Sequence, residues 1–170
     1  MIRSMNAFID KGITIRPEQT GDEDFLFKVY ASTRQEELDL TGWNADMRAA
    51  FLDMQFKAMR QGYRTMFPAA EFSIILRDEG KMGRMVIDRT DMEIRVVDLA
   101  LLPEVRNQGI GTLLMQHICR EAEQSKKTVT LSVLKNTRPV SWYQRLGFSI
   151  IGQTGFYEEM ERRLAGVSSI

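Results

Sequence analysis

The apolar positions in the first part of the chain predict one short strand followed by two helices. A short apolar run at Ile13 and Ile15 predicts a strand, and the acidic Asp22 then introduces a helix running toward Ser32. Apolar residues spaced three or four apart predict a second, amphipathic helix over Asp46–Tyr63. We expect its apolar stripe to face the core; the stripe consists of Met47, Ala50, Phe51, Met54, Ala58 and Met59.

The middle of the chain changes to the shorter runs that are typical of strands. Three β-branched and aliphatic runs, separated by DEGK and TDM, lie at Glu71–Arg77, Met82–Arg89 and Glu93–Leu102. They predict an antiparallel meander of three strands. The third run is the most apolar, so we expect it at the centre of the sheet.

The last third of the chain predicts a helix, a strand, a short helix and two final strands. Their expected ranges are Gly111–Ser125, Thr128–Leu134, Pro139–Leu146, Phe148–Gly152 and Phe156–Arg162. The whole order predicts an α/β fold with a mixed, mostly antiparallel central sheet and flanking helices. The helix beginning at Gly111 would provide one parallel crossover.

Length and composition limit the classes of protein. We find no repeat or linker, so residues 1–170 are expected to form a single domain with a core of about 13–164. The 23 basic and 23 acidic residues balance, which gives no reason to expect a nucleic-acid partner. One cysteine and one histidine exclude disulfide frameworks and multi-histidine or multi-cysteine metal sites, so no metal is expected. The chain shows neither a signal peptide nor a membrane-spanning run, and we expect it in the cytoplasm, without a membrane partner.

One segment, EVRNQGIGTLL at Glu104–Leu114, places Arg106 and two close glycines directly before a helix. It is not a dinucleotide-binding GxGxxG, because Leu114 occupies the third glycine position. It is not a phosphate-binding P-loop either, since no lysine follows Gly111. What remains is RxxGxG at a strand-to-helix turn, where free amides and the helix dipole favour a pyrophosphate.

This turn and a second block resemble the GNAT superfamily of acetyl-CoA-dependent N-acetyltransferases. VVDLALLPEVRNQGIGTLL is similar to the family's acetyl-CoA-binding segment, and NTRPVSWYQRLGF, from Asn136 to Phe148, is similar to its later segment. Two blocks in the right order and separation are more specific than a single GxG. Pro139 departs from the commoner alanine, but a proline fits the first turn of a helix.

The resemblance implies acetyl-CoA as co-substrate and a set of residues that bind it. The central strand's backbone would pair with the pantetheine arm, and the Leu101 N–H would polarise the thioester carbonyl. Turn amides would hold the pyrophosphate. The implied residues are Leu99, Ala100, Leu101, Arg106, Asn107, Gln108, Gly109, Ile110, Gly111, Thr112 and Asn136. The alternatives are a solvated surface arginine for Arg106 and a helix N-cap for Asn136.

The implied reaction is direct attack of a primary amine on the thioester within a ternary complex. Tyr143, in the family's tyrosine position, would protonate the departing thiolate, and Asp98 or Glu93 would accept the amine's proton directly or through water. The alternatives are that Asp98 organises the end of the strand and that Glu93 is a solvated surface residue. Cys119 and His117 are interpreted as packing or surface residues.

Two further classes of function stay open. A non-catalytic acyl-CoA-binding module would keep the turn, although Tyr143 in its family position argues against it. An interaction protein could use the Asp46–Tyr63 helix with the neighbouring Gly42 and Trp43 as a partner groove, or self-associate as a homodimer. The acceptor, a small-molecule or peptide amine, is not identified by the sequence.

Overall fold

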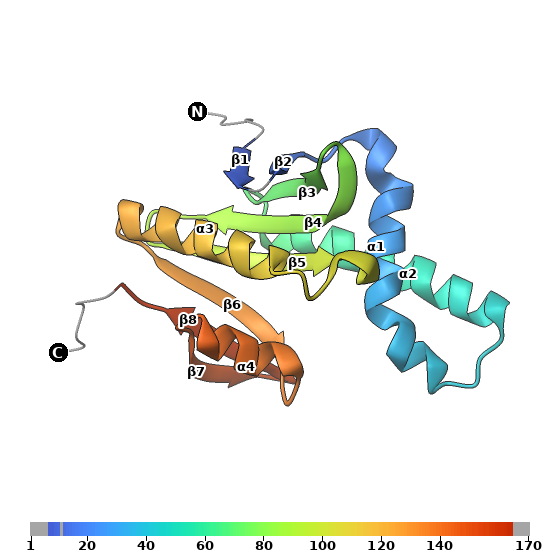
Figure 1. Ribbon diagram of the computed structural model, residues 1–170. Helices are drawn as coiled ribbons and strands as arrows, with labels where there is room; N and C mark the ends of the chain where they lie inside the picture. The colour runs from blue at the N-terminus through green and yellow to red at the C-terminus, as the bar shows by residue number, and fades with distance from the viewer. Residues whose placement is uncertain (1–6, 11, 165–170) are drawn as a thin grey trace.

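Within residues 7–10 and 12–164, the part of the chain that the computed structural model describes, eight strands form one mixed sheet (Figure 1). The strands are β1 Ala7–Asp10, β2 Ile13–Pro17, β3 Glu71–Arg77, β4 Gly80–Arg89, β5 Glu93–Leu101, β6 Thr128–Leu134, β7 Ser149–Thr154 and β8 Tyr157–Arg162. The helices are α1 Glu23–Asp39, α2 Ala45–Met66, α3 Ile110–Ser125 and α4 Arg138–Arg145, with 3₁₀ turns η1 Thr20–Asp22 and η2 Pro103–Val105.

The predicted fold class is confirmed. The sheet order is β1-β2-β3-β4-β5-β6-β8-β7, and β3, β4 and β5 form the expected antiparallel meander. β5 lies inside the sheet, as its apolar sequence predicts, and pairs in parallel with β6 through the α3 crossover. The four-residue β1 was not predicted, because it is too short to show a period; it pairs with β2 across an irregular register.

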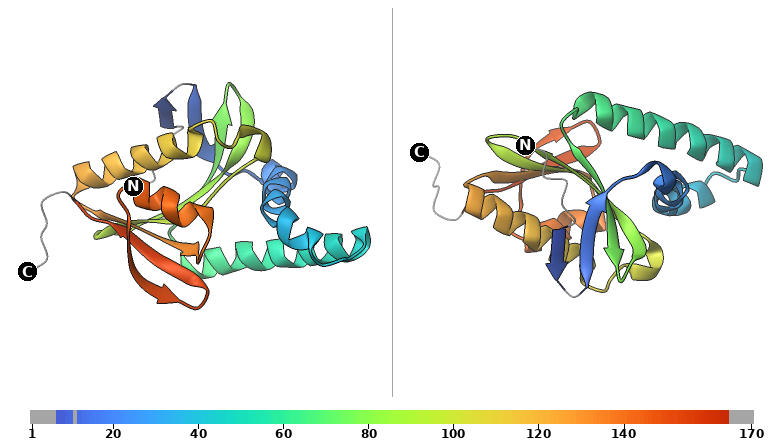
Figure 2. Two further views of the ribbon diagram at one scale, coloured as in Figure 1. Left: turned by 60° about the horizontal axis from the view of Figure 1, so that its bottom comes forward. Right: turned by 90° about the horizontal axis from the view of Figure 1, so that it is seen from above.

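The helices cover both faces of the sheet (Figure 2). Ile74 and Ile75, neighbours on β3, point to opposite faces and belong to different core clusters. The larger cluster packs under α3, which contributes Leu114 and Ile118 to it. The smaller cluster lies under α1 and α2 and includes Phe56. None of the helices in the described residues has the length and hydrophobicity that crossing a bilayer requires.

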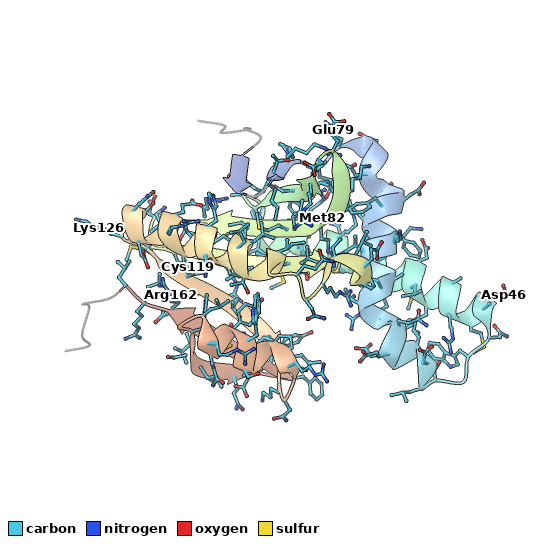
Figure 3. All side chains as sticks on the ribbon, in the orientation of Figure 1. Asp46, Glu79, Met82, Cys119, Lys126 and Arg162 are labelled. Atoms are coloured by element: carbon cyan, nitrogen blue, oxygen red, sulfur yellow. The ribbon has the colours of Figure 1, made fainter. Side chains whose placement is uncertain are left out.

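The predicted core stripe of α2 was wrong except at Met59. Phe56 is buried, with Leu52 and Met59 packed beside it, whereas Met47 and Met54 are 49% and 56% exposed. The reason is the position of the helix: its N-terminal part, marked by Asp46 in Figure 3, extends away from the sheet. A stripe is buried only where a sheet lies beneath it, so helical period alone did not identify the buried face.

The helix start at Asp22 is held by ion pairs rather than by a side-chain cap. Asp22 is 1% exposed, and its carboxylate lies 2.6 Å from Arg16 Nη1 and 2.7 Å from Lys81 Nζ. The Gln19 N–H also donates to it, at 2.9 Å. Chiefly because Arg16 donates to this carboxylate, the pKa of Asp22 lies well below its ordinary value. This cluster fixes η1 to the sheet and sets where α1 begins.

A bulge in β5 changes which residues face which helices. Val86 pairs with Asp98 and Ile87 with Val96, so Val97 is the additional residue. Val96, before the bulge, and Leu99, after it, both pack in the cluster under α3. Asp98 therefore points to the opposite face, toward α2.

Candidate active site

The parallel strands β5 and β6 separate halfway along their length. Their pairing runs from Glu93–Thr128 to Val96–Leu131, after which β6 continues against β8 as far as Leu134. The glycine turn follows β5 and α4 follows β6, so both flank the opening between the strand ends. The carboxyl ends of parallel strands are where α/β folds commonly bind ligands.

The backbone of β5 directs alternate amides into this opening. The Leu102 N–H donates to the Met82 carbonyl of β4 at 2.8 Å. Because donors alternate along an antiparallel strand, the Ala100 N–H also faces β4, and the N–H groups of Leu99 and Leu101 face the opening. Of the three residues predicted to pair with pantetheine, Leu99 and Leu101 thus have the suitable backbone orientation.

The glycine turn leaves the first amides of α3 without helical partners. Gly109 is the N-cap, with φ of 79°, and Asn107 also has a positive φ of 59°. The first helical bond here is donated by Leu113 to the Gly109 carbonyl, at 3.0 Å. The preceding N–H groups, from Ile110 to Thr112, point out of the helix start, where an anion is favoured. The positive φ explains why position 109 needs glycine.

Gly111 has a different local constraint. A Cβ atom at this position would lie 3.4 Å from Cζ2 of Trp142, which belongs to α4. The Trp142 indole also donates to Thr112 Oγ1 at 3.2 Å. The first turn of α3 and the tryptophan of α4 are therefore in direct contact beside the opening.

Arg106 and Asn136 both take positions that the sequence did not predict. Arg106 is exposed, but Nε donates to the Leu101 carbonyl at 2.8 Å and Nη2 to Ser32 Oγ at 3.1 Å. It links the end of β5 to α1 rather than extending into solvent. Asn136 has a positive φ of 57°, and the N-cap of α4 is Thr137, so the N-cap interpretation of Asn136 was wrong.

Tyr143 lies on α4 between two aromatic rings. Its ring centroid is 4.6 Å from that of Trp142 and 5.6 Å from that of Phe148. Burial, with the nearby negative charge of Asp98 as the second cause, raises the pKa of Tyr143 to about 12. The phenol is therefore a neutral hydrogen-bond donor at physiological pH. Pro139 lies in the first turn of α4, as expected.

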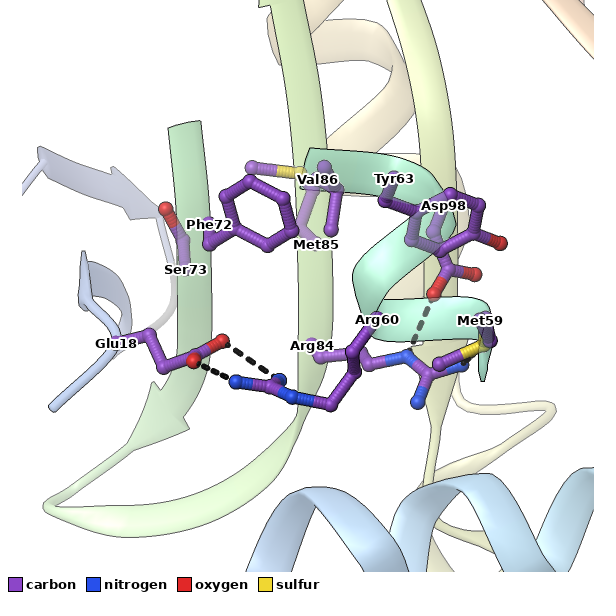
Figure 4. Close-up of a pocket in the computed structure, with 10 residues that line it drawn as sticks. All are labelled: Glu18, Met59, Arg60, Tyr63, Phe72, Ser73, Arg84, Met85, Val86 and Asp98. Atoms are coloured by element: carbon purple, nitrogen blue, oxygen red, sulfur yellow. Dashed lines mark hydrogen bonds and ion pairs between the residues drawn. The ribbon is translucent and has the colours of Figure 1, made fainter. Parts of the chain in front are cut away.

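Asp98 is paired with a buried arginine that sequence reasoning missed. Arg84 Nε lies 2.6 Å from Asp98 Oδ2, and the two side chains are 7% and 15% exposed, respectively (Figure 4). Tyr63 of α2 borders the same cleft, and burial, followed by the charge of Asp98, raises its phenol pKa. The free space is about 10 Å³, about what one water molecule needs. Asp98 thus faces a small polar cleft under α2.

Glu93 does not join this group. It lies at the opposite end of β5, where Thr130 Oγ1 donates to its carboxylate at 3.1 Å. Leu101 is eight positions further along the strand, a distance of about 26 Å at roughly 3.3 Å per residue. Asp98, three residues from Leu101, is the nearer of the two predicted carboxylates.

Comparison with known proteins agrees with this arrangement. The family model described as an acetyltransferase (GNAT) domain matches residues 68–150, which include the meander, the glycine turn and α4. A curated relative, the peptidyl-lysine N-acetyltransferase YjaB of Salmonella typhimurium, is 26% identical over 113 residues, covering 65% of this chain and 73% of the relative. These matches support a GNAT-superfamily acetyltransferase, with residues 68–150 similar to the GNAT domain.

Solved structures show the same GNAT fold. PaiA N-acetyltransferase from Thermoplasma acidophilum, crystallised with coenzyme A, has a TM-score of 0.65 at 19% identity, over 89% of this chain and 99% of that one. A GNAT family acetyltransferase from Elizabethkingia anophelis with acetyl-CoA bound has a TM-score of 0.57 at 17% identity, over 91% and 100% of the two chains. At this identity the likeness shows the fold alone.

The single cysteine and single histidine of the chain lie outside this arrangement. Cys119 is 7% exposed in the core under α3 and lies next to Arg162 of β8 (Figure 3). His117 is half-buried, and burial lowers the pKa of its imidazole. The expected packing position of Cys119 is confirmed. Within the described residues, no three His, Cys, Asp or Glu side chains are grouped so that they could hold a metal ion.

Proposed function

We propose that this protein transfers the acetyl group of acetyl-CoA to a primary amine by direct attack within a ternary complex. The observation that carries the proposal is that the amides of β5 that face away from β4 and the free amides of the glycine turn flank the same opening between β5 and β6. The first set suits the amide groups of a pantetheine arm, and the second suits a pyrophosphate. The relatives that were crystallised with coenzyme A or acetyl-CoA support the same ligand.

In this proposal, acetyl-CoA lies along the opening between β5 and β6, from the point where the two strands separate to the glycine turn. The backbone of Leu99 and Leu101 pairs with pantetheine, next to Ala100, whose own N–H faces β4. The Leu101 N–H donates to the thioester oxygen as negative charge develops there. The amides of Asn107, Gln108, Gly109, Ile110, Gly111 and Thr112 surround the pyrophosphate. Arg106 stabilises the turn through its bond to the Leu101 carbonyl, and Asn136 borders the pantetheine.

The chemistry then needs one proton acceptor and one proton donor. Asp98 takes the proton that the attacking nitrogen loses, directly or through water, and Glu93 is the second carboxylate to be tested. Tyr143 donates toward the thiolate as the carbon–sulfur bond breaks. Because a thiol has a pKa near 8.5 and the phenol one of about 12, complete proton transfer to the thiolate is unfavourable, and Tyr143 acts mainly by donating a hydrogen bond to the departing sulfur.

A two-part experiment tests this function. Acetyl-CoA at about 100 times its dissociation constant should stabilise the native state by about 2.7 kcal/mol, measured as a rise in melting temperature. A panel of small-molecule and peptide amines should then show acceptor-dependent release of CoA. Absence of a thermal shift contradicts the proposed ligand, and a shift without release for any amine contradicts the proposed reaction.

The proposal extends to the organisation of the protein. We propose one catalytic domain over residues 1–170, with a core of about 13–164, because one sheet includes every described strand. We place its action in the cytoplasm. The edge strand β7, with Ile150 and Ile151 43% and 55% exposed, is the surface by which a homodimer could form. Sedimentation at decreasing protein concentration distinguishes a dimer from a monomer.

A further inference from the structure

Arg84 is buried with only part of its hydrogen-bonding capacity used. The residue is 6% exposed, and Nε is paired with Asp98. Nη2 donates to the Met59 sulfur at 3.5 Å, and within the described residues Nη1 has no hydrogen-bond partner. Leaving guanidinium donors buried and unsatisfied is costly, so this edge of Arg84 is a site where a ligand would be favoured.

The groups around Nη1 and Nη2 of Arg84 do not satisfy the hydrogen bonds of these two atoms. The ring of Tyr30 lies 5.8 Å from Arg84 Cζ, which gives a cation–π attraction but no hydrogen bond to the N–H groups. The thioether of Met59 is a weak acceptor on a flexible side chain. When Met59 moves aside, Nη1 and Nη2 form the two-pronged donor that fits a carboxylate in a bidentate geometry.

The position of this edge also limits the ligand. Arg84 and Asp98 line one cleft, so a carboxylate on the outer edge of Arg84 lies close to the proposed base (Figure 4). The cleft has only about 10 Å³ of free space, room for one water molecule, so a carboxylate can enter only when Met59 moves aside. An acceptor whose carboxylate is bound by Arg84 and whose amine reaches Asp98 must therefore have only a few bonds between these two groups.

We infer that Arg84 anchors a carboxylate of the acceptor, and that the acceptor is a small amino acid with its amine a few bonds from that carboxylate. The inference rests on the proposed acetyl transfer. It disfavours a lysine side chain within a peptide, whose amine has no nearby free carboxylate. It also disfavours a linear polyamine, which has no carboxylate to accept from the free N–H groups of Arg84.

The test compares each acceptor with a version of itself that lacks the anion. Purified protein with acetyl-CoA is given the common α-amino acids and β-alanine, each beside its carboxamide, and a blocked lysine peptide and a linear polyamine. CoA release is measured as kcat/KM. For the preferred amino acid, the free acid should exceed the carboxamide by about tenfold to a hundredfold, as expected for a charge-assisted pair.

Variants then assign the preference to Arg84. Arg84→Gln removes the charge. Arg84→Lys keeps a cation beside Asp98 but removes the paired Nη1 and Nη2 donors. Both variants should bring the ratio of kcat/KM for the free acid to that for its carboxamide close to one. Arg48→Gln is the matched control, because Arg48 is paired with Asp39 at 2.8 Å on the surface and should keep the ratio. An acetyl-CoA thermal shift in every variant shows that the fold and the first ligand site are intact.

Several outcomes would overturn the inference while leaving the proposed function standing. They are equal rates with acid and amide in the wild type, a preference that survives in both Arg84 variants, and turnover of only those amines that lack a carboxylate. If the wild type shows no acetyl-CoA shift at all, the proposed function fails and the inference falls with it.

Discussion

Replacing Gly111 separates two explanations for glycine at the start of α3. In one, a phosphate approaches the backbone so closely that a side chain would interfere. In the other, glycine only makes room for Trp142, whose Cζ2 would lie 3.4 Å from a Cβ at this position. Alanine distinguishes them, because a methyl group fits in ordinary contact with the indole but still covers the amides of the first turn.

The expected magnitudes follow from this geometry. Without ligand, Gly111→Ala should leave stability unchanged or raise it by up to about 1 kcal/mol, which is about 2 to 4 °C for a chain of this size. With acetyl-CoA, losing one charge-assisted bond to the backbone weakens affinity by about tenfold or more. At a concentration of about 100 times the wild-type dissociation constant, stabilisation should fall from about 2.7 to about 1.4 kcal/mol.

The assay is a thermal melt with and without acetyl-CoA for three variants. Gly111→Val, whose branched carbons would extend toward Trp142, should lose the ligand-induced shift while the fold is still present by circular dichroism. Gly62→Ala is the matched control, since Gly62 lies inside α2 and a Cβ there meets nothing within 4 Å. An unchanged shift in both Gly111 variants would refute the phosphate explanation and leave Trp142 packing as the reason for glycine.

Three further predictions concern single side chains. Tyr143→Phe should reduce turnover by at least about 10²-fold with little change in acetyl-CoA affinity, measured where chemistry limits the rate. Asp98→Asn should lower the rate at neutral pH, with recovery as the amine deprotonates at higher pH, whereas Glu93→Gln should have little effect. Asp22→Asn should destabilise the protein by about 1 to 3 kcal/mol at neutral pH, measured by urea unfolding, because the partly exposed Arg16 and Lys81 lose their charged partner.

Each of these predictions has a result that would contradict it. Near wild-type turnover in the Phe variant would make Tyr143 a packing residue, and a flat pH response would make Asp98 structural. For Asp22 the lowered pKa fixes the sign: its contribution is complete above the ordinary pKa of an aspartate and is lost as pH falls toward the lower, folded-state value. An Asp22→Asn protein that loses stability in acid just as the wild type does would contradict that assignment.

The strands of the meander and the helix after the glycine turn could be predicted because local pattern decides them. β3 and β6 have the predicted limits, and α3 begins one residue before its predicted start. Gly109 was also recognisable, since a strand-to-helix turn with a left-handed residue favours glycine. In these places the local preference and the tertiary structure agree.

The remaining features depend on contacts between distant segments. Arg84 and Asp98 are 14 residues apart and meet only because β4 and β5 pair, while the bulge at Val97 decides which face Asp98 takes. A charged residue in the apolar run MGRMVIDR was the one local signal for Arg84. The exposed part of α2 could not be recognised, because it depends on where the sheet ends.

The early end of the β5–β6 pairing gives the middle of this sheet the properties of an edge. The amides of Leu99 and Leu101 lie inside the molecule but face away from β4. Buried strand amides usually exchange their protons with solvent only when the protein opens, whereas amides without a strand partner exchange far more readily. Isotope exchange at these two amides therefore reports directly on whether the opening is filled. This exchange measurement requires no knowledge of the acceptor amine.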